Sequence, residues 1–218
     1  MSLTFIGQKK GMMQLFDAEG KLVPCTIIAV EPNTIVRIKD RETEGYNAVQ
    51  IGGIKMTKAQ AFRAKKPLRS YYAKQGIEPL RILRESRVDD TASYKVGQTL
   101  DLTYFADIKY VDVEGVTKGK GFQGVMKLHG MSGGPAAHGS GFHRHAGSTG
   151  MRSTPGRCFP GGPRASRMGG DRQTTQNLKV VAIHGNLLLV KGAVPGAPGA
   201  VIQVTASLKR HQQKIKRG

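Results

Sequence analysis

Residues 178–191 read LKVVAIHGNLLLVK, and this stretch carries the clearest structural signal in the chain. Two apolar runs, Leu178 to Ile183 and Leu187 to Lys191, flank the tripeptide His184-Gly185-Asn186. Valine and isoleucine favour strands, and glycine and asparagine adopt the backbone angles that a tight turn requires. The stretch therefore predicts an antiparallel β-hairpin.

Similar short runs recur on both sides of this hairpin, separated by turn-forming residues such as Glu31-Pro32-Asn33. Short strands at this spacing are typical of a barrel or a sandwich, so the fold class is predicted to be mainly β. Further strands are expected at Val23 to Val30, Thr34 to Lys39, Tyr46 to Ile51, Leu80 to Arg84, Leu100 to Phe105, Ile108 to Val113 and Val201 to Ala206.

Helix is sparse. Thr57 to Lys66 predicts one short helix that ends before Pro67, and Arg69 to Lys74 predicts another that ends before Gly76. Strands and helices do not alternate along the chain, which argues against a doubly wound nucleotide-binding fold.

The chain has 218 residues and a formal net charge of +19, far beyond the value of about 8 that is the upper end for a small soluble domain. Such a charge suits a polyanion, either nucleic acid or an anionic membrane surface. The membrane alternative is weak, because the longest aliphatic run is only Leu187 to Val190 and the first residues, MSLTFIGQKK, contain no apolar signal stretch. Cys25 and Cys158 are far apart, so we expect a reduced, cytosolic chain without a disulfide framework.

The charge is concentrated in the second half of the chain. Residues 1–115 hold 18 Lys/Arg against 14 Asp/Glu, whereas residues 116–218 hold 16 Lys/Arg against the single acid Asp171. Residues 116–175, the Gly-rich segment, contain 15 of the 29 glycines and very few large aliphatic side chains. A cationic segment of this composition cannot build its own core, and we expect it to become ordered when a partner neutralises it.

This composition predicts three parts: a discontinuous folded body of residues 1–115 and 176–208 with short helices near 57–75, the Gly-rich segment 116–175, and a basic tail, 209–218. Phe122, Phe142 and Phe159 are interleaved with the cations of the Gly-rich segment. They either stack on unpaired bases or pack against the body.

Two patterns in the Gly-rich segment resemble enzyme motifs. Residues 119–124 read GKGFQG and match the dinucleotide pattern G-x-G-x-x-G, but no amphipathic helix is expected after them and the next acid, Asp171, is too distant. Residues 130–134 read GMSGG and match the nucleophile elbow G-x-S-x-G, with Ser132, Asp171 and His184 in the order found in hydrolases. The residues after Ser132 do not begin a helix convincingly, so both patterns are weak.

The histidines of the segment form a third candidate site. His138, His143 and His145, with His129 nearby, have Gly, Ser and Arg as neighbours instead of the Cys or carboxylate ligands that usually complete a zinc site. We expect no metal here, and we interpret these imidazoles as donors to phosphates or as partners for bases. A nucleic-acid-acting enzyme and a free nucleic-acid-binding regulator remain as alternatives.

Several motifs, taken together and in order, resemble the bacterial large-subunit ribosomal proteins of the L three family. The resemblance covers nearly the whole chain, which makes it far more specific than any short pattern above. It rests on residues 6–12 (IGQKKGM), Phe105, Asp112, residues 117–124 (TKGKGFQG), residues 143–145 (HRH), residues 154–157 (TPGR) and residues 186–196 (NLLLVKGAVPG).

The resemblance implies a split β-barrel of the translation-protein, elongation-factor-like type, with a small helical insertion and a long Gly-rich basic loop extension. It implies a non-enzymatic structural constituent of the large ribosomal subunit, in the cytoplasm, that binds large-subunit rRNA near the 3′ end and nucleates assembly. The extension would project towards the peptidyl transferase centre, with its tip around Leu128 to Gly134. Expected partners are rRNA and neighbouring ribosomal proteins, with no membrane, small-molecule substrate, cofactor or metal.

By position, the resemblance matches Lys118, Lys120, Lys127, Arg144, His145, Arg152 and Arg157 to basic residues that face rRNA. The charge of the Gly-rich segment and the tail adds further candidates. These are Arg164, Arg167, Arg172, Lys209 and Arg210, with Lys214, Lys216 and Arg217 beyond them.

Three departures from the family pattern limit this transfer. Leu128 and His129 stand where many members have Arg and Trp, and the chain has no Trp, so a contact made by a stacked indole is absent or made differently. Residues 151–153 (MRS) offer no glutamine for the N-methylation found in some members, so we predict no such modification. Residues 160–164 (PGGPR) replace a common Lys pair, which lowers the local charge.

Overall fold

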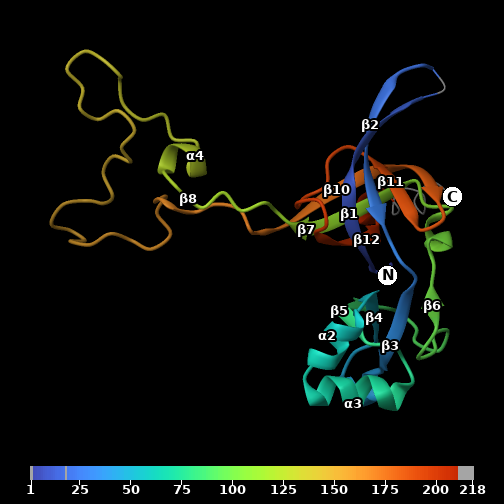
Figure 1. The fold of residues 1–218 in the computed structure, drawn as a ribbon. Coiled ribbons are helices and arrows are strands. Elements are labelled where there is room, and N and C mark those ends of the chain that lie inside the picture. The colour runs from blue at the N-terminus through green and yellow to red at the C-terminus, as the bar shows by residue number, and fades with distance from the viewer. Residues whose placement is uncertain (1, 18, 211–218) are drawn as a thin grey trace. The chain divides into compact units, whose positions relative to one another are not determined.

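The computed structural model describes residues 2–17 and 19–210 and is a mainly β protein (Figure 1). It comprises two compact units: the body, Met1–Val116 with Arg172–Gly218, and the extension, Thr117–Asp171. Composition had assigned residues 172–175 to the Gly-rich segment. In the structure they belong to a body strand, because Arg172 to Thr175 pair with Val116 to Val113.

Six antiparallel strands of the body close into a barrel in the order β1-β12-β7-β10-β11-β2. The hairpin predicted from residues 178–191 is confirmed, since Ile183 pairs with Leu188 and His184 with Leu187. The strands are β1 (Phe5–Phe16), β2 (Leu22–Ala29), β7 (Tyr110–Val116), β10 (Arg172–His184), β11 (Leu187–Lys191) and β12 (Val201–Ala206).

The body also contains a four-stranded antiparallel sheet in the order β5-β4-β3-β6. Its strands are β3 (Asn33–Lys39), β4 (Ala48–Lys55), β5 (Leu80–Arg87) and β6 (Thr99–Leu100), and α1 (Arg41–Glu44) connects β3 to β4. The helices α2 (Lys58–Arg63) and α3 (Lys66–Gln75) lie between β4 and β5 in the chain (Figure 1). Tyr72 of α3 is buried with Val36 and Leu80, and its hydroxyl donates to the Leu80 carbonyl at 3.2 Å.

One hydrophobic core is shared by the barrel and this sheet. Phe5, Val113 and Val204 from barrel strands belong to the same buried cluster as Ile35 and Ile51 from the sheet. The shared core explains why a single body forms from strands that lie in two sheets.

Two of the motifs that carry the family resemblance meet in the barrel. Lys9 of β1 is buried, and its Nζ donates to the carbonyls of Val194 (2.7 Å) and Gly196 (3.0 Å) in the loop between β11 and β12. The backbone of Lys9 also pairs with that of Ala200 at 3.0 Å. Lys9 thus stabilises the fold, and its buried ammonium group is not available to a polyanion.

Several sequence-based predictions were wrong in detail. Leu100 to Phe105 is not one strand: β6 ends at Leu100, and the 3-10 helix η1 (Leu102–Phe105) turns Phe105 inward against Phe5 at a ring-centroid distance of 4.8 Å. Strand β1 was not predicted, because glycines and lysines interrupt its apolar pattern. Pro67 does not follow a helix but lies in the first turn of α3. Proline is tolerated there because the N–H groups of the first turn make no hydrogen bond within the helix.

The turn at residues 31–32 separates two strands that do not pair with each other, β2 and β3. β2 pairs with β1 and β11 in the barrel, whereas β3 pairs with β4 and β6 in the second sheet. None of the helices in the described ranges combines the length and apolar composition that a bilayer crossing requires.

Candidate nucleic-acid interface

The base of the extension is joined by backbone hydrogen bonds between its two ends. Thr117 N donates to Asp171 O at 2.9 Å, and Lys120 N donates to Met168 O at 2.8 Å. Beyond these bonds, β8 (Phe122–Gln123) pairs with β9 (Ser166–Arg167). The two ends of the extension therefore run together as a narrow stem.

One glycine is required by this stem. Gly169 has a φ of +76°, and a Cβ added there would lie 2.2 Å from the carbonyl oxygen of Lys118. Any side chain would therefore both strain the backbone and force the two ends of the stem apart. At this position the chain therefore needs a glycine so that the two ends of the stem can pack closely.

Past the stem, the extension has almost no hydrophobic core. The structure describes all of Thr117–Asp171, and only Val125, in the five-residue helix α4 (Val125–His129), is buried. Phe122, Phe142 and Phe159 are all exposed, so their packing against a core is not observed. The three phenylalanine rings are therefore available for contact with a partner.

Every cation that sequence analysis assigned to the extension is exposed, and none of them is ion-paired within it. Their single acidic neighbour in the extension is Asp171. A row of unpaired cations separated along an irregular backbone can follow a row of phosphates. These cations are Lys118, Lys120, Lys127, Arg144, Arg152, Arg157, Arg164 and Arg167, and the predicted contact residue His145 is exposed as well.

Two of the predicted contact residues lie next to aromatic rings. The guanidinium of Arg157 lies 5.1 Å from the ring centroid of Phe159, and the ring of His145 lies 5.7 Å from that of Phe142. Such pairs offer flat surfaces for an unpaired base, and Arg157 adds a positive charge beside its ring that suits a phosphate.

The candidates outside the extension differ from one another. Arg172 is ion-paired with Glu114, its Nη2 donating to Glu114 Oε2 at 2.6 Å, which raises the pKa of the guanidinium. Arg210 covers the ring of Tyr110 at 4.2 Å, and Lys209 is exposed. Lys214, Lys216 and Arg217 lie outside the described residues.

The enzyme-like patterns take other structural roles. A helix does follow residues 119–124, contrary to expectation, but α4 is only five residues long. Ser132 lies in irregular chain after that helix and not at a strand-to-helix turn. His129 Nε2 lies 2.9 Å from the Arg164 carbonyl oxygen, and across residues 2–17 and 19–210 there is no cluster of three or more metal-ligating side chains.

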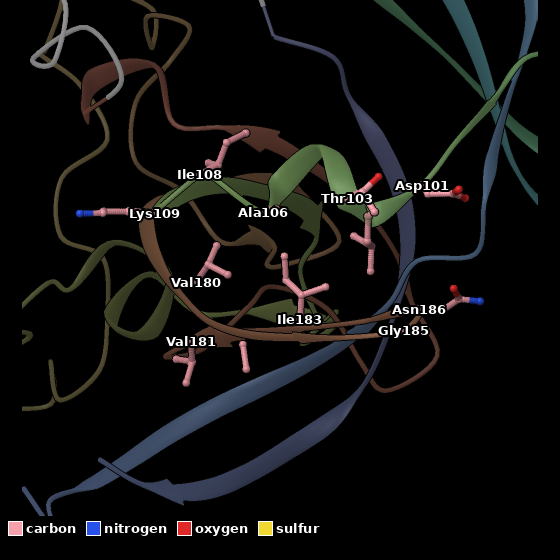
Figure 2. A pocket seen from close by; sticks show the side chains of 12 residues that line it. Asp101, Thr103, Ala106, Ile108, Lys109, Val180, Val181, Ile183, Gly185 and Asn186 are labelled. Atoms are coloured by element: carbon pink, nitrogen blue, oxygen red, sulfur yellow. The ribbon is translucent and has the colours of Figure 1, made fainter. Parts of the chain in front are cut away.

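The body contains a hollow of about 530 Å³ beside η1 and the β10–β11 hairpin (Figure 2). Figure 2 shows Lys109 on one side and Asp101 and Asn186 on the other, with Val180 and Ile183 between them. The residues that line it include no His, Cys or Ser.

Comparison with known proteins agrees with the motifs. A family model described as Ribosomal protein L3 matches residues 85–186. The chain is 48% identical over 220 residues to the large ribosomal subunit protein uL3 of Protochlamydia amoebophila (strain UWE25), with 98% of this chain and 94% of the relative covered.

Relatives from two further organisms match over a similar share of the chain. The uL3 protein of Chlamydia felis (strain Fe/C-56) is 48% identical over 212 residues, with 94% of this chain and 96% of the relative covered. The uL3 protein of Chlamydia pneumoniae is 47% identical over 213 residues, with 94% of this chain and 97% of the relative covered. Identity at this level across both units shows that the chain belongs to the Ribosomal protein L3 family.

Proposed function

We propose that the chain binds large-subunit rRNA near its 3′ end, nucleates assembly of the subunit and projects its extension towards the peptidyl transferase centre. As a member of the Ribosomal protein L3 family it is a structural protein of the large ribosomal subunit in the cytoplasm and not an enzyme. Neighbouring ribosomal proteins are its further partners. The body then corresponds to a split β-barrel of the elongation-factor-like type, and the extension to a Gly-rich basic loop.

The observation that carries the proposal is the extension's lack of a core of its own. It holds exposed cations and exposed phenylalanines around a single buried residue, Val125. Such a segment gains little by folding alone, and RNA supplies both the neutralising charge and the missing surface. The hydrogen-bonded stem sets where the extension leaves the barrel, so the body determines the point at which it enters the RNA.

Phosphate contacts provide affinity in this arrangement, and exposed rings provide selectivity for unpaired bases. Lys118 and Lys120 at the stem are the first cations to meet RNA, and Arg144 and Arg152 lie further along the extension. Arg172 contributes less than these, because Glu114 already neutralises it.

The test measures binding of the full chain to a transcript of the 3′ domain of large-subunit rRNA over a range of salt concentrations. The triple variant K118Q/K120Q/K127Q removes three exposed cations. If each one contacts a phosphate, the slope of log K against log salt should fall by about 2. The matched control, K95Q/K179Q/K191Q, removes three exposed lysines of the body and should change the slope less.

Sedimentation of a cell lysate tests the wider assignment. The wild-type chain should remain with large subunits through a salt-washed sucrose gradient. A chain found only with small free proteins would instead fit a nucleic-acid-binding regulator. If log K falls with log salt equally steeply for the two triple variants, the proposed role of the extension in RNA binding is wrong.

A further inference from the structure

A second cationic surface lies on the body, far along the chain from the extension. Between Glu44 and Glu78 the sequence contains seven cations and no acid. Lys55 pairs with Glu78 at 2.6 Å, which leaves six exposed cations without an ion pair. These six lie on or beside α2 and α3: Lys58, Arg63, Lys65, Lys66, Arg69 and Lys74.

An open cleft of about 470 Å³ lies between these two helices. Its volume is within the range of small-ligand sites, roughly 300–1,000 Å³. Two cations and one exposed aromatic ring stand among apolar and small residues in its lining. The lining includes Lys58, Phe62, Arg69, Tyr72, Ile77 and Pro79.

Phe62 is the unusual residue of this cleft. Its side chain is 76% exposed, although the hydrophobic core that Tyr72 enters is close by in the same helical insertion. The Arg69 guanidinium lies 5.7 Å from the Phe62 ring centroid. The exposed ring and the cations that border it together suit a partner that has both a π-face and a negative charge.

The walls of the cleft are held in place by local structure. Thr57 and Gln60 form a capping box at the start of α2, with Gln60 N donating to Thr57 Oγ1 at 3.3 Å and Thr57 N donating to Gln60 Oε1 at 3.2 Å. α3 is anchored by the buried Tyr72. A site that is already formed costs less ordering on binding than a loop would.

We propose that this cleft binds an unpaired nucleotide of RNA, with the base against Phe62 and the adjacent phosphate between Lys58 and Arg69. Every base has a π-face that stacks on an aromatic ring, and cations beside the ring bind the backbone. An acidic peptide would use the cations but leave the ring without a partner, so RNA accounts for more of the surface. The inference rests on the proposed function, because it supplies that rRNA-binding protein with a second contact in the body.

The experiment uses the full chain and a fluorescein-labelled decauridylate as the probe. Phe62→Ala should weaken binding on the order of tenfold, since stacking on one aromatic ring is a large part of single-strand affinity. Phe62→Tyr should retain it. The matched control is Phe16→Ala, because Phe16 is 74% exposed on β1 and does not line the cleft, and it should bind like the wild type. The thermal unfolding curve of each variant, compared with that of the wild type, shows whether the substitution affects folding.

Location is tested with a thiouridine-substituted probe, photocrosslinking and peptide mapping. Trypsin releases residues 59–63 (AQAFR) as one peptide that contains Phe62. This peptide should carry a crosslink in the wild type and also in K118Q/K120Q/K127Q. Arg69→Lys, which keeps the charge and loses the planar guanidinium, should reduce the crosslink yield.

The outcomes separate this inference from the proposed function. If the extension variant loses rRNA affinity while Phe62→Ala and Phe16→Ala bind the probe equally, the cleft assignment is wrong and the function stands. If neither the extension variant nor Phe62→Ala alters RNA binding, both are wrong. If a decaglutamate peptide binds in a Phe62-dependent way and the oligonucleotide does not, an acidic protein segment is the occupant and the RNA assignment is overturned.

Discussion

The side chain of Asn33 satisfies both backbone groups of Ile6. Ile6 N donates to Asn33 Oδ1 at 2.9 Å, and Asn33 Nδ2 donates to the Ile6 carbonyl at 3.1 Å. Ile6 belongs to the barrel strand β1 and Asn33 begins β3 of the second sheet, so this fully buried amide joins the two sheets. Gly53 completes the junction, because a Cβ there would lie 2.7 Å from Ile6 Cβ.

Asn33→Ala should lower the free energy of unfolding by about 2–4 kcal/mol, because it leaves a buried N–H and a buried carbonyl of Ile6 without partners. Urea unfolding followed by circular dichroism measures the change. The exposed Asn186→Ala serves as the control and should be nearly neutral. A loss below about 0.5 kcal/mol for Asn33→Ala would show that water replaces the amide at the junction.

Lys9→Met should destabilise the body by about 1–3 kcal/mol, since the ammonium group satisfies the carbonyls of Val194 and Gly196 inside the protein. The neighbouring Lys10→Met is a matched control. Lys10 is exposed and contacts only Gln8 Oε1, at 3.3 Å, so its substitution should leave the urea midpoint unchanged. Equal effects of the two substitutions would contradict a structural role specific to Lys9.

Glu85→Gln should reduce stability at neutral pH and have no effect in acid. The hydrogen bonds from Lys39 and Tyr46 hold the pKa of the Glu85 carboxyl below its ordinary value. A lowered folded-state pKa contributes stability above the unfolded value of about 4.3 and loses it as the pH falls through the folded value. The side chains are partly exposed, so we expect a difference below about 1 kcal/mol at pH 7. Thermal unfolding of both proteins from about pH 7 to about pH 3 measures it, and a difference that grows in acid would be the wrong sign.

A chain in which a short Gly-Ser turn replaces residues 117–171 should still unfold cooperatively. Val116 and Arg172 are directly paired across β7 and β10, so the deletion leaves two adjacent strand ends that a turn can join. The buried core also lies almost entirely in the body. Differential scanning calorimetry should show one transition, and its loss would mean that the extension takes part in the core.

The two cysteines should differ in reactivity. Burial raises the pKa of the Cys25 thiol, whereas contact with the Thr149 hydroxyl and the charge of Arg164 lower the pKa of the exposed Cys158 thiol. Because the thiolate is the reactive form, iodoacetamide at neutral pH should modify Cys158 first. Prior binding of the rRNA transcript should slow that reaction, as measured by mass spectrometry. An unchanged rate would show that this part of the extension does not contact RNA.

The sequence alone was enough to predict the mainly β class, most strands and the separate composition of the extension. These properties follow from local causes. The Val- and Ile-rich run at Leu178 to Ile183 favours a strand, and the scarcity of apolar residues in the Gly-rich segment forbids a core there. The family resemblance likewise depends on residue order alone.

Long-range contacts determined the rest. Lys9 and Lys10 are adjacent and chemically identical, yet one is buried against Val194 and Gly196 while the other is exposed. Average charge over residues 1–115 also concealed the cationic cleft, because the acids that balance its cations lie elsewhere in the chain. An acid-free run between Glu44 and Glu78 was the signal that a shorter window would have found.

Sequence by itself therefore determined most of the segments that become strands and the one segment that lacks a core, because backbone preference and side-chain hydrophobicity act locally. Only the tertiary structure decided that β2 and β3 enter different sheets, that Asn33 joins those sheets, and that Phe62 faces water between two cationic helices. Those outcomes depend on which distant strands share a core, and the free energy of that choice comes from contacts that no short stretch contains.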